Sequence, residues 1–354
     1  MREKTLERQY MIKLKLLTAL LLIALTTNGA SALVSYNWDV NDVGNWSDSD
    51  GQNWVDELGG SVAKPDGQYE VKVKGTGSIV TLNTVEGNWS YTGNGTRLRI
   101  YKGATLNVVN GGELRGFGWI RIGEQTGTPE QIGYLNQSGG LIFLGKFKET
   151  GKLAIGDGYG LLGGSTYTMS GGTLTYDAAT AGCDGQLVIG SRDGEGTFVI
   201  VGNAPVIHMK NLYVAGDSVA NGGGQYNNGI GTLKFMVGAN GVSPIVLDST
   251  AYIDQGTNTT ANLIVSLTSA PPIGQDIILV NATTHLHGTF DTLNGGSAAE
   301  GASLTLTFGK ANYDYTLTYA GGTDNRDIAL LWVPEPATII LITLGGLLAA
   351  VKRR

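Results

Sequence analysis

The chain has 354 residues, of which 24 are Lys or Arg and 30 are Asp or Glu, giving a net charge of −6. Glycine is abundant, at 55 residues, whereas proline contributes 8, which excludes collagen-like sequences and proline-rich linkers. Hydrophobic residues make up 42% of the chain, so the composition also argues against intrinsic disorder.

The amino end predicts a secretory signal peptide over residues 1–32. A short basic region after Met11 is followed by an apolar stretch over 16–25 and then by Ala30 and Ala32, and we expect cleavage after Ala32. The signal would be intact whether translation starts at the first methionine or at Met11. An uncleaved membrane helix is the alternative.

Residues 33–95 are rich in Trp, Asp and Asn and predict an N-terminal β segment or cap. The alternation of apolar and polar residues over 69–74 and 78–82 is typical of strands. The aromatic side chains in this segment either cap the first coil or bind carbohydrate; they are Trp38, Trp46 and Trp54.

Residues 96–241 contain a degenerate repeat in which a short strand leads through a Gly-Gly pair into another strand. The Gly-Gly pairs begin at 111, 139 and 171, and apolar strands end at Gly123, Gly156 and Gly190. Periods of about 30 residues indicate stacked supersecondary units. With no helical pattern between the strands, each repeat predicts one coil of a right-handed β-solenoid, in which neighbours bury each other's apolar residues.

Residues 242–333 carry longer alternating strands at wider spacing, which predict a β-sandwich-like cap over the open end of the solenoid. The expected fold class is therefore all-β, flanked by the signal peptide and a C-terminal transmembrane helix.

An acidic column is the one constellation that could bind a ligand. If the repeats are coils, the residues just after each strand-ending glycine stack about 4.8 Å apart. Ordinary turn chemistry is the favoured interpretation, and a calcium- or saccharide-binding groove is the alternative. The residues of this column are Glu124, Asp157, Ser191 with Asp193 close by, and Asp217.

Other motifs give no catalytic residues, no cofactor and no metal site. His285 and His287 would lie on one face of a strand, as two metal ligands do, but a third His or Cys is not close in sequence. The G-x-G-x-x-G match at 158–163 is followed by a strand, whereas a dinucleotide site needs a helix there. Cys183 is the only cysteine, and we expect it to be a small buried residue.

The carboxyl end, residues 334–354, has three parts: a Pro-Glu-Pro triplet, an uncharged apolar run from Ala337 to Val351, and a basic terminus. The run would span about 22 Å as a helix, and the snorkelling of Lys352 helps it to cross a bilayer. The basic cluster stays cytoplasmic, which places the rest of the chain outside. The named residues are Pro334, Glu335, Pro336, Lys352, Arg353 and Arg354.

This order of elements resembles the PEP-CTERM sorting signal, which exosortase-type enzymes recognise in Gram-negative, biofilm-forming bacteria. The resemblance implies that the triplet is read by a sorting enzyme and has no catalytic role itself. In addition, 319–328 is similar to the closing strand pair of autotransporter-like passenger repeats, and 44–47 is similar to their start.

Without its two ends the chain carries 16 basic and 27 acidic residues, a net charge of −11, which opposes binding to nucleic acid. We expect an exported, non-enzymatic β-solenoid of the cell surface or extracellular matrix, anchored by its tail or released after processing. Its expected partners are the sorting enzyme, the membrane and an extracellular polysaccharide. The alternatives are a polysaccharide lyase or hydrolase, by analogy of fold, and a carbohydrate-binding protein.

Overall fold

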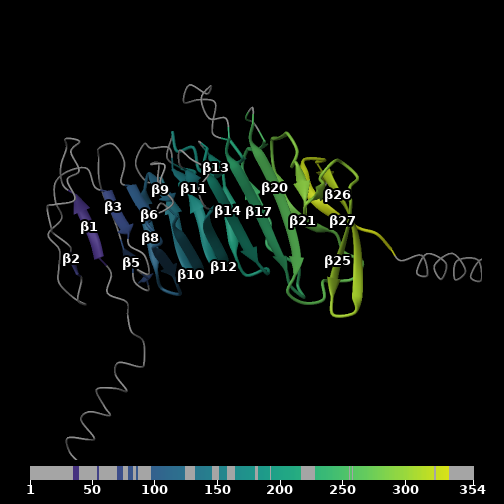
Figure 1. The fold of residues 1–354 in the computed structure, drawn as a ribbon, viewed down its shortest axis with the longest axis horizontal. Coiled ribbons are helices and arrows are strands. Elements are labelled where there is room, and N and C mark those ends of the chain that lie inside the picture. Colours follow the sequence, from purple (N-terminus) through teal and green to yellow (C-terminus); the bar gives the residue numbers. More distant parts are fainter. Residues whose placement is uncertain are drawn as a thin grey trace, which may run out of the picture.

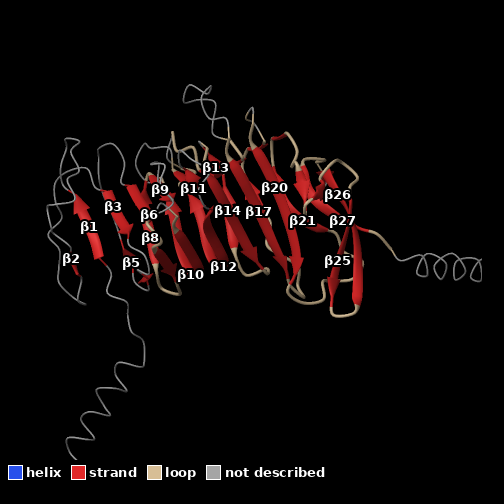
Figure 2. Cartoon of the chain, in the orientation of Figure 1, coloured by secondary structure: helices blue, strands red, loops and turns tan. Residues whose placement is uncertain are grey.

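The computed structural model describes residues 35–39, 54–55, 70–74, 79–82, 85–86, 97–123, 132–145, 151–157, 164–179, 182–191, 193–216, 228–254, 256, 258–322 and 324–334. All the regular secondary structure in these ranges is β-strand (Figure 2). The strands stack side by side along one long axis, from β1 at one end to β25–β27 at the other (Figure 1). This confirms the all-β class and the β-solenoid architecture.

Each coil contributes a strand to three parallel faces. The first face is a 10-stranded sheet in which neighbouring coils pair in parallel from β3 to β22. Its strands, in spatial order, are β2 (Trp54–Val55), β1 (Ser35–Asp39), β3 (Glu70–Lys74), β6 (Arg97–Tyr101), β9 (Trp119–Ile122), β11 (Lys152–Asp157), β13 (Gln186–Ser191), β16 (Asn211–Val214), β19 (Thr250–Ile253) and β22 (His285–His287).

The second and third faces share two long strands that bend from one face to the other. The second face comprises β4 (Ile79–Leu82), β7 (Thr105–Val108), the first halves of β10 (Tyr134–Leu144) and β12 (Gly164–Tyr176), β14 (Glu195–Val201), β17 (Ile230–Val237), β20 (Thr260–Leu267) and β23 (Thr292–Leu293). The third face comprises β5 (Val85–Glu86), β8 (Glu113–Phe117), the second halves of β10 and β12, β15 (Val206–Met209), β18 (Ile245–Leu247) and β21 (Ile277–Ala282).

The Gly-Gly pairs that begin at 139 and 171 lie where β10 and β12 pass from the second face to the third, and the pair that begins at 111 lies between β7 and β8. Gly140 has φ +67°, and a Cβ there would lie 2.1 Å from the carbonyl oxygen of Gly112 in the coil before. Gly172 repeats this arrangement one coil later, with φ +79° and a Cβ that would lie 2.3 Å from the oxygen of Gly139. Glycine is required here because the corners of successive coils approach backbone to backbone.

The core is built from ladders of like residues, one from each coil. On the first face the ladder is fully buried, and its members are Ile100, Ile122, Ile155, Ile189, Val214 and Ile253. On the second face it runs through Leu106, Leu135, Tyr167, Phe198, Leu233, Leu263 and Leu293. Each such side chain contributes about 1.5–3 kcal/mol when buried, and only an adjacent coil can bury it.

At both ends the pairing changes from parallel to antiparallel. At the amino end β1 pairs antiparallel with β3, and β2 with β1. At the carboxyl end β24 (Gly296–Ser297) turns back on β23, and β25 (Ser303–Phe308), β26 (Ala311–Gly321) and β27 (Asp327–Trp332) form an antiparallel meander. β27 also pairs antiparallel with β21, so the meander continues the sheet of the solenoid.

The parallel coils extend into both segments that were expected to flank the repeat. Strands β3, β4 and β5, within 70–86, pair in parallel with the coil that follows them. Beyond residue 241, strands β18 to β23 still pair in parallel with the preceding coil, and antiparallel pairing begins where β24 pairs with β23 and where β27 pairs with β21. Longer, more widely spaced strands therefore belong to larger coils as well as to the closing meander.

Candidate functional site

Asp157, a member of the predicted acidic column, lies at the end of β11 and is fully buried. It is in register with Ser191 of the next coil, whose hydroxyl donates to Asp157 Oδ1 at 3.0 Å. The residues after two successive strand-ending glycines therefore do stack. Both side chains, however, are fully buried.

The counter-ion of Asp157 is supplied by the chain. Arg121 Nε lies 3.0 Å from Asp157 Oδ2 in an ion pair that does not have the geometry of a hydrogen bond. The Arg121 side chain is 5% exposed and the Asp157 side chain 0%. The guanidinium carbon of Arg121 also lies 3.5 Å from the ring centre of Trp119. A buried carboxylate requires such a partner, and here an arginine of the preceding coil supplies the positive charge.

Asp193 lies two residues after Ser191, in the turn into β14, with φ +65°. Its Oδ1 accepts a hydrogen bond of 2.9 Å from the backbone N–H of Asn228. This is turn chemistry, since short polar side chains tolerate the left-handed region and satisfy nearby backbone groups. Asp157 and Asp193 thus serve different purposes.

The other predicted site residues lie outside the described ranges, except Pro334, which is the last residue described and is exposed. Those outside are Ala30, Ala32, Glu124, Asp217, Glu335, Pro336, Ala337, Val351, Lys352, Arg353 and Arg354. Within the described ranges there is no helix of sufficient length and apolarity to cross a membrane.

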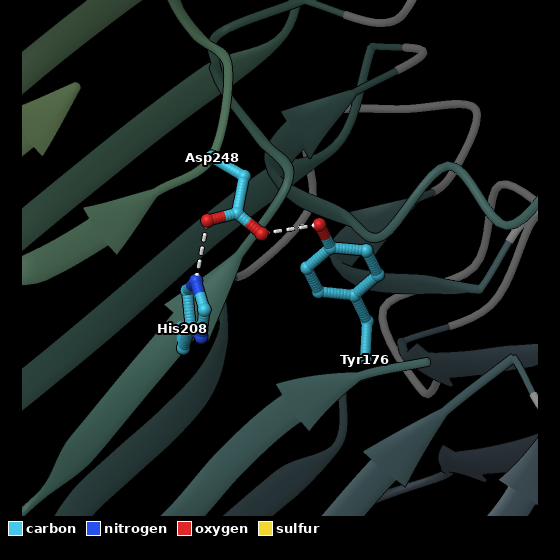
Figure 3. A network of polar contacts seen from close by, with 3 residues as sticks. All are labelled: Tyr176, His208 and Asp248. Carbon is cyan, nitrogen blue, oxygen red and sulfur yellow. Dashed lines mark hydrogen bonds and ion pairs between the residues drawn. The ribbon is translucent and has the colours of Figure 1, made fainter. Parts of the chain in front are cut away.

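A polar network on the third face joins residues from three successive coils (Figure 3). Asp248, just after β18, accepts a hydrogen bond of 2.5 Å from the Tyr176 hydroxyl through Oδ2. Its Oδ1 lies 2.6 Å from His208 Nε2. Sequence reasoning missed this network, because 72 and 40 residues separate Tyr176 and His208 from Asp248. Only the register of the coils brings the three together.

The network is arranged to hold a carboxylate, and both Asp248 oxygens are engaged. Burial alone would raise the pKa of Asp248, but the hydrogen bonds from Tyr176 and His208 outweigh it and leave the pKa below the ordinary value of 3.8. Burial and the bond to Asp248 raise the pKa of Tyr176, so its hydroxyl remains a donor at neutral pH. The arrangement links coils and leaves no free carboxylate for acid–base chemistry at this position.

The outward side of the second face carries a column of hydroxyl and amide side chains. Register aligns one residue from each of five coils, and these are Thr166, Thr197, Thr232, Asn262 and Thr292. Successive members lie about 4.8 Å apart, the spacing of strands in a sheet. The column is a repetitive polar surface in which each coil presents similar groups at a constant interval.

An open groove of about 510 Å³ lies over the carboxyl end of this column. Thr292 Oγ1 donates to Asn262 Oδ1 at 2.7 Å within it. Just after β23, the side-chain amide of Asn294 pairs with the backbone of Val265 in β20. Asn294 Oδ1 accepts from Val265 N–H, and Asn294 Nδ2 donates to Val265 O, both at 2.8 Å. The lining is completed by Thr232, Ile264, Ser266 and Gly295. Such a mixture of hydroxyl, amide and aliphatic groups suits a neutral, hydroxyl-rich ligand.

His285 and His287 lie on β22 with both side chains exposed. As their spacing predicts, the two rings are close, with centres 5.7 Å apart. Among the described residues there is no group of three or more His, Cys, Asp or Glu that could hold a metal ion. Cys183 is 3% exposed, as expected for a small buried residue, and burial raises the pKa of its thiol.

Comparison with known proteins gives no relative from which a role could be transferred. No protein-family model, curated protein or solved structure matches this chain.

Proposed function

We propose that this chain is a non-enzymatic β-solenoid protein of the bacterial cell surface or extracellular matrix, of the kind associated with biofilms. In this proposal the coils wind right-handed, residues 1–32 are a cleaved signal peptide, and 337–351 form a membrane helix. Pro334, Glu335 and Pro336 are read by an exosortase-type sorting enzyme, after which the protein stays anchored or is released.

The observation that carries the proposal is the repetitive polar column on the second face. An enzyme needs one concave site with groups left free to react. Here the conspicuous polar groups engage one another: Asp157 is paired with Arg121, and Asp248 is held by two donors. A surface that repeats from coil to coil is suited instead to many weak contacts with a long partner.

Cell fractionation tests the sorting step. The full chain would be expressed in a Gram-negative host that carries an exosortase-type system, beside a variant with Pro334→Ala, Glu335→Ala and Pro336→Ala. We expect the full chain at the cell surface or in the matrix, whether anchored or released, and the variant retained in the inner membrane. Lys310→Ala, in the exposed turn between β25 and β26, is the control and should sort normally. The same location for both chains contradicts the proposal that a sorting enzyme reads the triplet.

Binding of an extracellular polysaccharide is a second candidate function, favoured by the groove on the second face. Thr232→Val and Asn262→Leu would remove polar groups from its lining. In a glycan-array experiment these changes should abolish any signal given by the natural chain. Thr105→Val, on the same face but outside the groove, should leave it unchanged. Turnover of a bound polysaccharide would instead support the lyase or hydrolase alternative.

A further inference from the structure

The last strand of the first face, β22, carries two exposed imidazole side chains, those of His285 and His287. His285 and His287 stand on the same side of the strand, as residues i and i+2 do. β22 is also the terminal member of the 10-stranded sheet, paired with β19 on one flank. The pair therefore lies at the open end of a long outer surface, where ions in solution can reach it.

The distance between the rings suits chelation of a single ion. Zinc–nitrogen bonds are about 2.0–2.1 Å long, so two imidazoles that bind one ion have centres within about 6.5 Å of each other. The centres of His285 and His287 are 5.7 Å apart and the ring planes are tilted by 43°. The separation of the two ring centres therefore lies within the range that a shared ion requires.

An aromatic stack on the first face holds one of the two rings in position. His287 lies flat against Tyr252, with ring centres 5.2 Å apart and planes 16° from parallel. Tyr252 in turn stacks on Tyr213 at 4.8 Å and 6°, and Tyr213 is 8% exposed. Because Tyr252 covers one face of the His287 ring, the ring is constrained, while its nitrogens lie on the ring edge and away from the stacked face. Less side-chain freedom is then lost on binding an ion.

We propose that His285 and His287 form a two-imidazole site for a first-row divalent transition metal such as Zn²⁺, Ni²⁺ or Cu²⁺, with Tyr252 as a positioning residue. Imidazole is a preferred ligand of these ions, whereas Ca²⁺ and Mg²⁺ prefer oxygen. Two protein ligands leave the remaining coordination positions to water or to an incoming ligand. The site is independent of the sorting tail and of the groove.

Calorimetric titration of the untagged full chain with ZnCl₂ tests the site. We expect one ion bound per chain, and a loss of affinity of about tenfold or more in His285→Gln and in His287→Gln, since each removes one of two bonds to the ion. Tyr252→Leu, which keeps both ligands but removes the stack, should weaken binding by a smaller factor. Thermal melting of each variant verifies that it is folded.

The chain supplies its own control because it contains three histidines in total. The third, His208, is engaged with Asp248 on a different face. His208→Gln should therefore bind Zn²⁺ like the natural chain. Equal binding by the natural chain and the His285→Gln, His287→Gln double variant would overturn the proposal. So would the absence of any Zn²⁺ binding, or its loss in His208→Gln alone.

Discussion

Asp248 illustrates how single residues join the coils of this solenoid. Its carboxylate accepts hydrogen bonds from Tyr176, two coils earlier in the chain, and from His208, one coil earlier. One side chain thus links residues of three coils (Figure 3). Parallel strand pairing links only adjacent coils. A contact that reaches across two coils therefore adds a constraint that the strand ladders cannot supply.

The first prediction concerns the pH dependence of this link. The pKa of Asp248 is lowered in the folded chain, so its stabilising effect is fully present above the unfolded value of about 3.8 and is lost as the pH falls through the lower folded value. Asp248→Asn should thus lower the melting temperature at pH 7. Because Asp248 is 39% exposed, solvent screening limits the loss to about 1 kcal/mol, or about 2–4 °C.

Melting curves of the natural chain and Asp248→Asn between pH 3 and pH 7 check this prediction. The difference in melting temperature should narrow as the pH approaches 3. Asp193→Asn is the control, because it removes the same charge from a carboxylate that accepts a hydrogen bond from a backbone N–H in a turn. A difference for Asp248→Asn that is constant across the range would show that its ionisation is not coupled to folding.

At the level of the element, a glycine near the end of β11 and of β13 sets how closely the backbone of another strand approaches. Gly190 has φ +66°, and a Cβ there would lie 2.1 Å from the carbonyl oxygen of Ile230. Gly202 has nearly the same φ, +65°, but nothing lies within 4 Å of its Cβ position. A side chain at Gly202 would meet only the strain of a positive φ, whereas a side chain at Gly190 would meet both this strain and a steric clash.

The second prediction uses this pair. Gly202→Ala should cost about 1–2 kcal/mol, the penalty for a side chain in the left-handed region. Gly190→Ala should cost about 1–3 kcal/mol more, because the neighbouring backbone must also move. Urea unfolding followed by circular dichroism measures both. Equal losses would mean that Ile230 yields freely and that the coils are less tightly packed than the structure indicates.

These glycines also explain what the sequence could reveal. The Ile-Gly strand ends and the Gly-Gly pairs recur because a similar close approach of backbones recurs in several successive coils, so the repeat and the solenoid were predictable. The pairing of Arg121 with Asp157 was not predictable, because it depends on both sides of β11 being buried. Alternation implies that residues beside a buried ladder are exposed, whereas every residue of β11 and β13 is buried.

At the level of the whole molecule, a solenoid must prevent its end coils from pairing with another chain. The carboxyl end does so by reversing direction: β27 runs antiparallel to both β21 and β26, and brings Leu330 opposite Ile277 and Leu317. The extent of the coils was less predictable than their existence, because the strands of the last coils and of the meander have similar patterns. The last coils pair in parallel and the meander pairs antiparallel, and the alternation of apolar and polar residues does not indicate the direction of pairing.

The third prediction tests whether this meander protects the end of the solenoid. Leu330 is fully buried and its neighbour Leu331 is 39% exposed, so adjacent positions on one strand provide a matched pair. Leu330→Asp places an unpaired charge in the core and should cost about 4 kcal/mol or more, whereas Leu331→Asp should change stability by about 0.5 kcal/mol or less. Light scattering after size-exclusion chromatography, at several protein concentrations, should show concentration-dependent association of Leu330→Asp and none of Leu331→Asp. If Leu330→Asp is destabilised yet stays monomeric, the antiparallel meander serves stability alone, and protection of the end must come from another part of the chain.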